Sequence, residues 1–384
     1  MAGQHNGDDM VEDARTSLRT ALREASHGLV GREALCELIL LAAVAGEHLL
    51  VVGPPGTAKS EAVRRMTRAL GGRGFEYLLG RFTEPAELFG PVDLRKLREG
   101  VLEVDTTGML PEADFAFLDE LFLGSTAILN TLLGVLAERR YRRGRTDLTV
   151  PLRVCVAACN HLPESPELAA LADRFVLRAY VEALPDSRLE ELLDAADSQN
   201  SLADGIDDNR RLAALDRLRA ARSGVDLRGA RPAFAEAVRT LRGAGVVLSD
   251  RRVVRSQRLV QAAALLAGRT QATGSDIWPL LFAAPTAEAQ ATARRVLPAL
   301  VQAAESELLP HAVAQVSDGP DALAGRLLSE AADWVASAEA AAEAGRPRLL
   351  GWLRDVDVAF APADRPPALD AARTAVLTRA EAQA

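Results

Sequence analysis

Eight consecutive residues combine glycine, proline, one lysine and one serine in a spacing that suits phosphate binding. They follow the apolar stretch Leu49–Val52 and read Gly53-Pro54-Pro55-Gly56-Thr57-Ala58-Lys59-Ser60. A turn between a strand and a helix leaves several backbone N–H groups without partners, and these donors and the helix dipole attract phosphates. Lys59 adds a positive charge for the β- and γ-phosphates, and Ser60 offers a hydroxyl to Mg²⁺. The run therefore predicts a phosphate-binding loop.

One position departs from the common pattern of such loops, G-x-x-x-x-G-K-[ST]. Ala58 stands where the second glycine is expected. Alanine is comfortable there only if its φ angle stays negative. On this motif alone, a glycine-proline turn with a chance Lys-Ser pair remains the alternative interpretation.

Two adjacent carboxylates follow the apolar segment Phe115–Leu118. Ligands of open α/β sheets bind at the carboxyl ends of strands, so Asp119 and Glu120 can face the same crevice as the loop. We expect Asp119 to hold Mg²⁺ beside Ser60, and Glu120 to orient and deprotonate the attacking water. An acidic pair favoured by a helix dipole is the alternative, but the order of the two motifs argues against chance.

An amide and several arginines complete the candidate chemistry. Asn160 ends the apolar run Leu152–Cys159, where its side chain can hold the nucleophilic water against the γ-phosphate. An ordinary asparagine in a turn is the alternative. Two arginine motifs follow, Asp173-Arg174-Phe175 and Ser249-Asp250-Arg251-Arg252. The fixed fork of donors on arginine suits the charge that develops on phosphoryl oxygens.

Short apolar segments alternate with helical patterns over the first half of the chain. The expected strands are 49–52, 75–79, 115–118, 152–158 and 174–181, with helices over 59–70 and 125–138. Fully apolar short strands separated by helices argue for a parallel sheet covered on both faces. After Pro185 the strand signals disappear and Ala/Leu/Arg/Glu helices continue. The fold class is therefore α/β, with an all-α part after it.

Composition limits the classes of protein that this chain can represent. Its 384 residues favour two or three domains, and a net charge of −8 gives no general attraction to nucleic acid or anionic membranes. No apolar stretch reaches eighteen residues and the start is polar and acidic, so we expect a cytoplasmic protein without membrane insertion. The three cysteines, Cys36, Cys155 and Cys159, are expected to be buried inert thiols.

Taken together, these residues resemble the MoxR group of AAA+ ATPases and, within it, the RavA-like branch. The resemblance covers about residues 28–285 and rests on GPPGTAKS, YLLGRFTEPAELFGP, LPEADFAFLDELFLGSTAILNTLLGVLAERRYRRG, VPLRVCVAACNHLPESPELAALADRF and LSDRR. Alanine at position 58 looks like that branch's own variant. The implied fold is an AAA+ P-loop parallel sheet covered by helices, followed by an all-α lid domain and a C-terminal helical region.

The resemblance also implies roles for single residues, with ATP and Mg²⁺ as cofactors. The nucleotide-site residues would be Lys59 and Ser60 of Walker A, Asp119 and Glu120 of Walker B, Asn160 as sensor 1, and Arg251, or alternatively Arg252, as sensor 2. Gly31 and Arg32 would lie near adenine. Arg174 resembles the arginine finger that reaches a neighbouring subunit's nucleotide in a ring, usually a hexamer.

The implied domain organisation has a core with two insertions. Its parts are a disordered N-terminus (1–12), an α/β nucleotide-binding core (13–185) with a helix-2 insert (about 82–112) and a pre-sensor-1 hairpin (about 139–151), a small helical lid (186–285) and a C-terminal helical region (286–384). The hairpin is strongly basic, with Arg139, Arg140, Arg142, Arg143 and Arg145. Such a cluster favours nucleic-acid contact, subunit packing or a merely solvated surface. A solvated face is also expected for Arg255 and Arg258 of the helix after Ser249.

The function implied by the resemblance is that of an ATP-hydrolysing, ring-forming motor. It would remodel or assemble protein complexes in a chaperone-like manner, acting on a protein client with a partner that contains a von Willebrand factor A domain. A DNA-directed AAA+ motor is the alternative, because related ATPases with a helix-2 insert act on duplexes. A nucleotide-switched assembly scaffold is a third interpretation.

Overall fold

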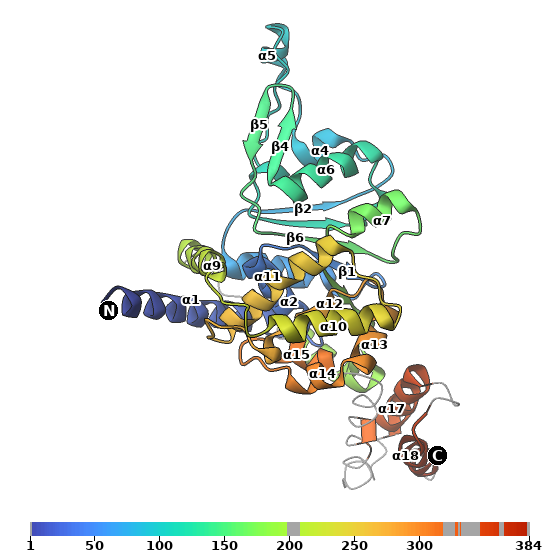
Figure 1. Cartoon of the computed structure of the whole chain (residues 1–384). Coiled ribbons are helices and arrows are strands. Elements are labelled where there is room, and N and C mark those ends of the chain that lie inside the picture. Colours follow the sequence, from blue (N-terminus) through green and yellow to red (C-terminus); the bar gives the residue numbers. More distant parts are fainter. Residues whose placement is uncertain are drawn as a thin grey trace. The chain divides into compact units, whose positions relative to one another are not determined.

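The structure is a computed structural model that describes residues 2–197, 208–317, 327–328, 331, 346–360 and 365–381. The chain forms two compact units (Figure 1). Unit 1 comprises Met1–Glu182 and Ala203–Val313, and unit 2 comprises Ala183–Leu202 and Ala314–Ala384. Unit 1 contains every residue predicted for the nucleotide site.

A five-stranded parallel sheet of order β2-β3-β6-β1-β7 forms the centre of unit 1. Its strands are β1 (Leu49–Val52), β2 (Gly74–Leu78), β3 (Phe115–Asp119), β6 (Val154–Cys159) and β7 (Leu177–Tyr180). β1 and β6 are buried along their whole length, which confirms the prediction of a parallel sheet covered on both faces. Val52 lies opposite Cys159 and Tyr180, so three strands end at one edge of the sheet.

Helices cover both faces of the sheet, because its central strands carry apolar side chains on both faces. On one face, Leu50, Ala116 and Ala157 pack in the same cluster as Leu132 and Val135 of α6 (Thr126–Glu138). On the other face lie α2 (Glu33–Ala45), which contacts β1, β6 and β7, and α3 (Lys59–Leu70), which contacts β2 and β3. All residues of α2 from Ala34 to Ala45 are buried, as expected for a helix that is apolar all round.

The remaining helices of unit 1 include those that form the lid. They are α1 (Ala2–Ser26), α7 (Pro166–Ala172), α9 (Asp208–Arg222), α10 (Arg231–Gly243), α11 (Asp250–Leu266), α12 (Pro279–Phe282), α13 (Ala287–Val296) and α14 (Pro298–Ala303), with short 3₁₀ turns at Leu110–Glu112, Leu121–Leu123 and Gly274–Asp276. The boundary between the two units falls within α15 (Pro310–Ser317). Within the described residues, no helix is both apolar and long enough to pass through a membrane.

The structure differs from the prediction that residues 1–12 are disordered, because α1 begins at Ala2. Leu18, Ala21 and Ala25 of this helix are buried where it packs on α3 and α9. Once such packed turns have formed, each further residue extends a helix at little cost, since nucleation is the expensive step. The polar composition of the segment does not reveal that continuation.

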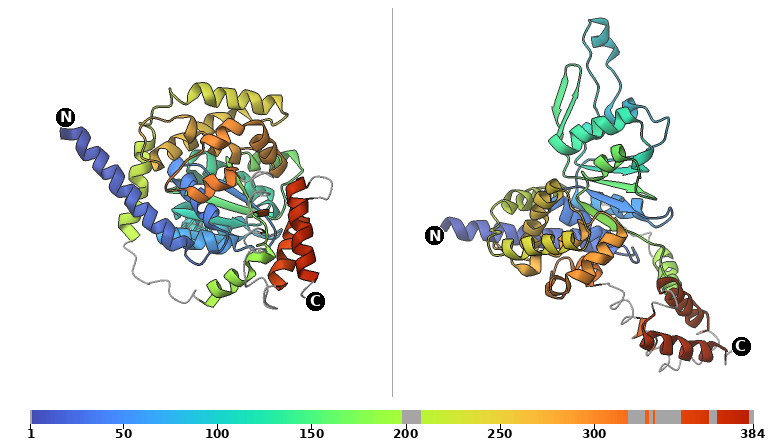
Figure 2. Two further views of the ribbon diagram at one scale, coloured as in Figure 1. Left: turned by 90° about the horizontal axis from the view of Figure 1, so that it is seen from below. Right: turned by 45° about the vertical axis from the view of Figure 1, so that its right-hand side comes forward.

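Two projections lie on the same side of unit 1, as the views of Figures 1 and 2 agree. The predicted helix-2 insert contains α4 (Pro85–Phe89), α5 (Leu94–Arg98) and an antiparallel bridge between Val92 and Val104. The second projection is the hairpin of β4 (Arg140–Arg143) and β5 (Thr146–Thr149). A Cβ atom on Gly144 would lie 2.4 Å from the Leu102 carbonyl oxygen, so only glycine permits this approach of the two projections.

The helices after the sheet are divided differently from the predicted lid at 186–285. Unit 2 takes the 3₁₀ turn Asp186–Arg188 and α8 (Leu189–Asp197) together with α17 (Arg346–Ala359) and α18 (Pro367–Glu381). Trp352 is buried in a cluster within this unit. α9 instead packs on α1, α2 and α3, with Leu215 and Leu218 fully buried. The sequence of a Leu/Arg-rich helix predicts which face of the helix is apolar. It does not predict which part of the protein packs against that face.

The cysteines are as expected from the sequence. Cys36, Cys155 and Cys159 are all buried and unpaired. Burial raises the pKa of each thiol to about 12, so the thiolate form is scarce near neutral pH. These residues act as small apolar side chains of the core.

Candidate nucleotide-binding site

The loop between β1 and α3 has the backbone conformation that its glycines require. A Cβ atom on Gly53 would lie 2.0 Å from the Val181 carbonyl oxygen, so the close packing against β7 needs glycine. Gly56 has a φ of 78°, in the left-handed region that glycine enters without penalty. Thr57 closes the turn by donating its hydroxyl to the Pro54 carbonyl at 2.9 Å. The loop residues of the sequence motif thus form one compact turn before α3.

Ala58 also adopts a left-handed conformation, with φ 55° and ψ 25°, immediately before α3. This conformation differs from the negative φ that would make alanine comfortable at this position. Left-handed backbone costs an L-residue roughly 1–2 kcal/mol, because its Cβ approaches a carbonyl oxygen. The geometry explains why glycine is the usual residue here: the chain must turn sharply to begin the helix.

We expect the substitution Ala58→Gly to stabilise the protein by up to about 1 kcal/mol. Relief of roughly 1–2 kcal/mol of strain outweighs the 0.4–1 kcal/mol that glycine typically costs through the unfolded chain. Urea denaturation measures the difference. The control Ala235→Gly makes the same change inside α10 and should destabilise by about 1 kcal/mol. Equal destabilisation by both substitutions would show that Ala58 is unstrained.

Lys59 is buried within the loop. Its Nζ donates to the carbonyl oxygens of Gly53 and Pro54, both at 2.7 Å, and only 7% of the residue is exposed. Burial lowers the pKa of this ammonium, while the nearby carboxylates of Asp119 and Glu120 raise it. The loop therefore holds a cation beside the two acids that the sequence predicts for the same site.

Arg32 binds the backbone on two sides of the loop. This buried guanidinium donates from Nε to the Thr57 carbonyl and from Nη2 to the Glu182 carbonyl, each at 2.7 Å. It also donates from Nη1 to the Gly31 carbonyl at 2.6 Å. Arg32 thus ties the phosphate-binding loop to the chain that follows β7. The role of Gly31 and Arg32 near adenine stays a prediction.

The acidic pair and the asparagine meet at the carboxyl ends of neighbouring strands. Asn160, which follows β6, donates from Nδ2 to Glu120 Oε1 at 2.6 Å. Glu120 has a φ of 49°, and its N–H donates to Asp119 Oδ1 at 3.0 Å. The turn after β3 thus separates the two acids, so that one binds the backbone while the other binds the amide. The structure brings together the residues predicted as Walker B and sensor 1.

The side chains of Ser60 and Asp119 are of the types that bind magnesium. Ser60 lies in the first turn of α3 and Asp119 ends β3, and the half-buried side chains of both carry hard oxygen donors. Mg²⁺ in proteins usually binds one or two carboxylates together with substrate phosphates. A site with one hydroxyl, one carboxylate and an adjacent phosphate-binding loop matches that donor set.

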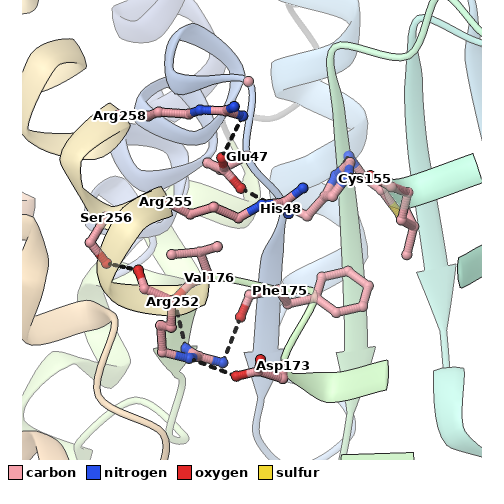
Figure 3. Close-up of polar contacts among 12 residues, drawn as sticks. Glu47, His48, Cys155, Asp173, Phe175, Val176, Arg252, Arg255, Ser256 and Arg258 are labelled. Carbon is pink, nitrogen blue, oxygen red and sulfur yellow. Dashed lines mark hydrogen bonds and ion pairs between the residues drawn. The ribbon is translucent and has the colours of Figure 1, made fainter. Parts of the chain in front are cut away.

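The arginine candidates differ sharply in their surroundings. Arg252 is 1% exposed and donates to Asp173 Oδ1 and to the carbonyls of Phe175 and Val176 at 2.8–3.1 Å (Figure 3). It also donates to the Ala283 carbonyl at 2.9 Å. Its guanidinium therefore binds the protein itself.

The other two arginines are more accessible. Arg251, in the first turn of α11, is exposed, which leaves it as the candidate for sensor 2. Arg174 is half-buried, and its Nε is buried without a hydrogen-bond partner.

Of the two further arginines of α11, Arg258 is exposed as the sequence suggests, whereas the side chain of Arg255 is largely buried. Arg255 and Arg258 form ion pairs with the two carboxylate oxygens of Glu47, at 3.3 and 3.1 Å (Figure 3). Glu47 is fully buried just before β1. Burial raises the pKa of this carboxyl, and the arginines oppose that shift. Sequence reasoning missed Glu47 because a single acid before a strand carries no pattern.

Burial and ion pairs reduce the free positive charge of the basic hairpin. Arg139 is the C-cap of α6 with a φ of 55°, and its Nη1 lies 2.6 Å from His48 Nε2. Burial lowers the pKa of Arg139 to about 10. On the hairpin itself, Arg140 pairs with Asp147 at 2.7 Å and Arg142 pairs with Glu138 at 3.0 Å. These ion pairs balance part of the positive charge of the hairpin, while Arg143 and Arg145 are exposed without an ion pair among those described.

The fold and the site define the class of protein. A parallel sheet of this strand order, a lysine-containing loop after β1, and an acid pair joined to an asparagine describe an AAA+ nucleotide-binding core. A family model described as "MoxR domain in the MoxR-vWA-beta-propeller ternary systems" matches residues 16–219, and an AAA lid domain model matches residues 235–292. The first match spans more than half of the 384 residues. The chain belongs to the MoxR family of AAA+ ATPases.

Individual relatives agree with this assignment. An uncharacterized protein of Methanocaldococcus jannaschii is 33% identical over 272 residues, which cover 70% of this chain and 69% of that protein. Chaperone MoxR1 of Mycobacterium tuberculosis is 28% identical over 169 residues, or 43% of this chain and 44% of that protein. The chain thus spans less than half the length of MoxR1.

A solved structure shares the fold. It is described as a putative ATPase from Cytophaga hutchinsonii, and it superimposes with a TM-score of 0.62 at 17% identity, covering 80% of this chain and 99% of that one. At this identity the likeness concerns the fold alone.

Proposed function

We propose that this protein hydrolyses ATP as a ring-forming MoxR-type motor and uses the energy to remodel or assemble protein complexes. The observation that carries the proposal is the 2.6 Å hydrogen bond between Asn160 Nδ2 and Glu120 Oε1, beside the loop that holds Lys59. An amide and a carboxylate so close together can position one water molecule for attack on a phosphoryl group. A protein that only binds nucleotide has no need of that pair.

The residues divide the chemistry of hydrolysis among them. Lys59 and the N–H groups at the start of α3 bind the phosphates and offset their charge. Glu120 accepts a proton from the attacking water, while Asn160 fixes the direction of the carboxylate. When bound to Ser60 and Asp119, Mg²⁺ would neutralise charge on the β- and γ-phosphate oxygens.

The proposal of a ring, with six subunits as the expected number, rests on Arg174. Transition-state charge in NTPases is commonly met by an arginine that a second subunit supplies. Arg174 has a buried Nε that binds no acceptor within the described residues of its own chain. The residue as a whole is only half-buried, so its exposed part can meet a nucleotide bound by a neighbouring protomer.

The partners follow from the family. Its matched model describes systems of a MoxR domain, a von Willebrand factor A domain and a β-propeller, which supports a partner of the second kind and a protein client. Membership of the RavA-like branch stays a prediction that rests on the motif sequences. Cytoplasmic location is part of the proposal, because ATP is plentiful there. We do not propose action on DNA, since the chain carries a net charge of −8 and two of the hairpin arginines pair with acids.

The first test is the substitution Lys59→Ala. Lys59 is one of only two lysines in the chain, and the other, Lys96, lies on α5 far along the sequence. We expect the wild-type protein to release phosphate from Mg-ATP, and Lys59→Ala to lose on the order of 10²-fold or more, because one preorganised donor is worth about 10²–10³. Lys96→Ala is the matched control and should retain its basal rate. A wild-type protein without turnover at any concentration would contradict the proposal.

A further inference from the structure

One buried guanidinium holds the chain on both sides of Arg174. Arg252 donates from Nε to Asp173 Oδ1 at 3.1 Å, which is the residue before Arg174. It donates from Nη2 to the Phe175 carbonyl at 3.1 Å and from Nη1 to the Val176 carbonyl at 2.8 Å, which follow Arg174. Figure 3 shows these contacts converging on one side chain from α11. The backbone that carries Arg174 is therefore bracketed by a single residue.

The second oxygen of Asp173 strengthens the same connection. Ser249 donates its hydroxyl to Asp173 Oδ2 at 3.0 Å, and it accepts the N–H of Arg252 at 3.2 Å as the cap of α11. Arg252 Nη1 also donates to the Ala283 carbonyl at 2.9 Å, at the end of α12. The segment before β7 is thus attached to the first turn of α11 and, through Arg252, to the end of α12.

The charges of Arg252 and Asp173 oppose any displacement of the segment around Arg174. Burial lowers the pKa of Arg252 to about 10, while Asp173 opposes that shift, so the guanidinium stays charged near neutral pH. A buried cation keeps its charge only if its donors remain bonded, and hydrogen bonds to charged groups are the strongest kind. Moving Asp173 or Phe175 relative to α11 would break several such bonds together.

Arg174 itself takes no part in these contacts. Its Nε is buried and binds no acceptor in the described part of the chain. Three contacts of Arg252 thus fix the residues on either side of Arg174, while Arg174 itself is only half-buried and keeps an exposed part for another partner. A rigid backbone that carries a partly exposed arginine is the geometry needed to meet charge that develops on a phosphoryl group.

We propose that Asp173 and Arg252 are positioning residues that hold Arg174 in place for catalysis on the nucleotide of a neighbouring protomer. The inference rests on the proposed function and adds a mechanical connection to it. Because Arg251 lies next to Arg252 in α11, a shift of that helix when nucleotide binds also moves Arg174. The nucleotide state of one site thereby affects hydrolysis at the adjacent site.

The substitution Asp173→Asn tests this inference most cleanly. Removing Arg252 leaves four acceptors unpaired in the core and threatens the fold, whereas asparagine keeps the shape of Asp173 and removes only its charge. We expect ATP affinity to be unchanged and turnover to fall about tenfold to a hundredfold, as misplacement of a catalytic group by about 1 Å does. Phosphate release and equilibrium nucleotide binding give the two values separately.

Two further measurements separate positioning from ordinary destabilisation. If Asp173 acts through Arg174, the double variant Asp173→Asn/Arg174→Ala should turn over at the same rate as Arg174→Ala alone. Mixing Asp173→Asn with Lys59→Ala subunits should restore turnover, because an intact site then meets an intact Arg174 from the other subunit. A folding defect within one subunit would not be rescued in this way.

The control is Arg242→Gln. Arg242, near the end of α10, forms an exposed ion pair with Asp250 at the start of α11, and loss of this pair should leave turnover unchanged. An active wild-type protein whose double variant shows additive losses, or whose mixed assemblies stay slow, would overturn the positioning role alone. A wild-type protein that hydrolyses no ATP would overturn the proposed function as well. The two failures are therefore distinguishable.

Discussion

Glu120→Gln should give a protein that binds ATP and fails to hydrolyse it. Glutamine matches the shape of Glu120 and can still accept the 2.6 Å hydrogen bond from Asn160 Nδ2. It cannot take a proton from water, and general base catalysis contributes about 10²–10⁴ in rate. Turnover should fall by that factor, while Lys59 and the backbone of the loop still bind the phosphates.

Phosphate release and equilibrium binding of ATP to the same samples check this expectation. Glu138→Gln is the control, because Glu138 is an exposed acid at the end of α6 that pairs only with Arg142 among the described ion pairs. Its turnover should match the wild type. Wild-type turnover in Glu120→Gln would remove Glu120 from the catalytic role, and loss of ATP binding would mean that the acid shapes the loop instead.

Local patterns predicted the parts of the site that lie close together in sequence. The helix expected over 59–70 is the observed α3, and the expected strand ends place Asp119, Glu120 and Asn160 at one edge of the sheet. Strand ends can be read from sequence because apolar runs end where polar side chains begin, and parallel strands align those ends. The chemistry of the site can therefore largely be predicted from the sequence.

Contacts between distant residues could not be predicted in the same way. Arg252 and Asp173 are separated by 79 positions, and Arg258 and Glu47 by 211. An arginine in a polar helix looks the same in sequence whether it faces water or a buried carboxylate. The partner becomes known only when α11 is packed against α2, α9 and α12, which is a tertiary property.

The left-handed backbone of Ala58 was also not predicted from the sequence, for a different reason. Left-handed φ is unfavourable for alanine, but the preference of one residue is overruled by the turn that joins β1 to α3. The same holds for Arg139, which ends α6 with a φ of 55°. Strain of this kind is a property of the surroundings rather than of the residue type.

Arg174→Ala should bind ATP normally and hydrolyse it roughly 10³–10⁵ times more slowly, the range that an arginine finger contributes in NTPases. The loss arises because the charge that develops on the phosphoryl oxygens then lacks the guanidinium that the neighbouring protomer supplies. An isolated monomer should be equally slow, so wild-type turnover per subunit should rise with protein concentration until assembly is complete.

Mixing Arg174→Ala with Lys59→Ala subunits distinguishes action within a protomer from action between protomers. Neither variant should turn over alone. In a mixed assembly, some intact Lys59 sites of one variant face intact Arg174 side chains of the other, so activity should return to a fraction set by the random order of subunits. Arg174→Lys keeps the charge but not the fork of donors, and it should recover only part of the rate. Activity that stays absent in every mixture, from subunits shown to co-assemble, would mean that Arg174 serves its own protomer.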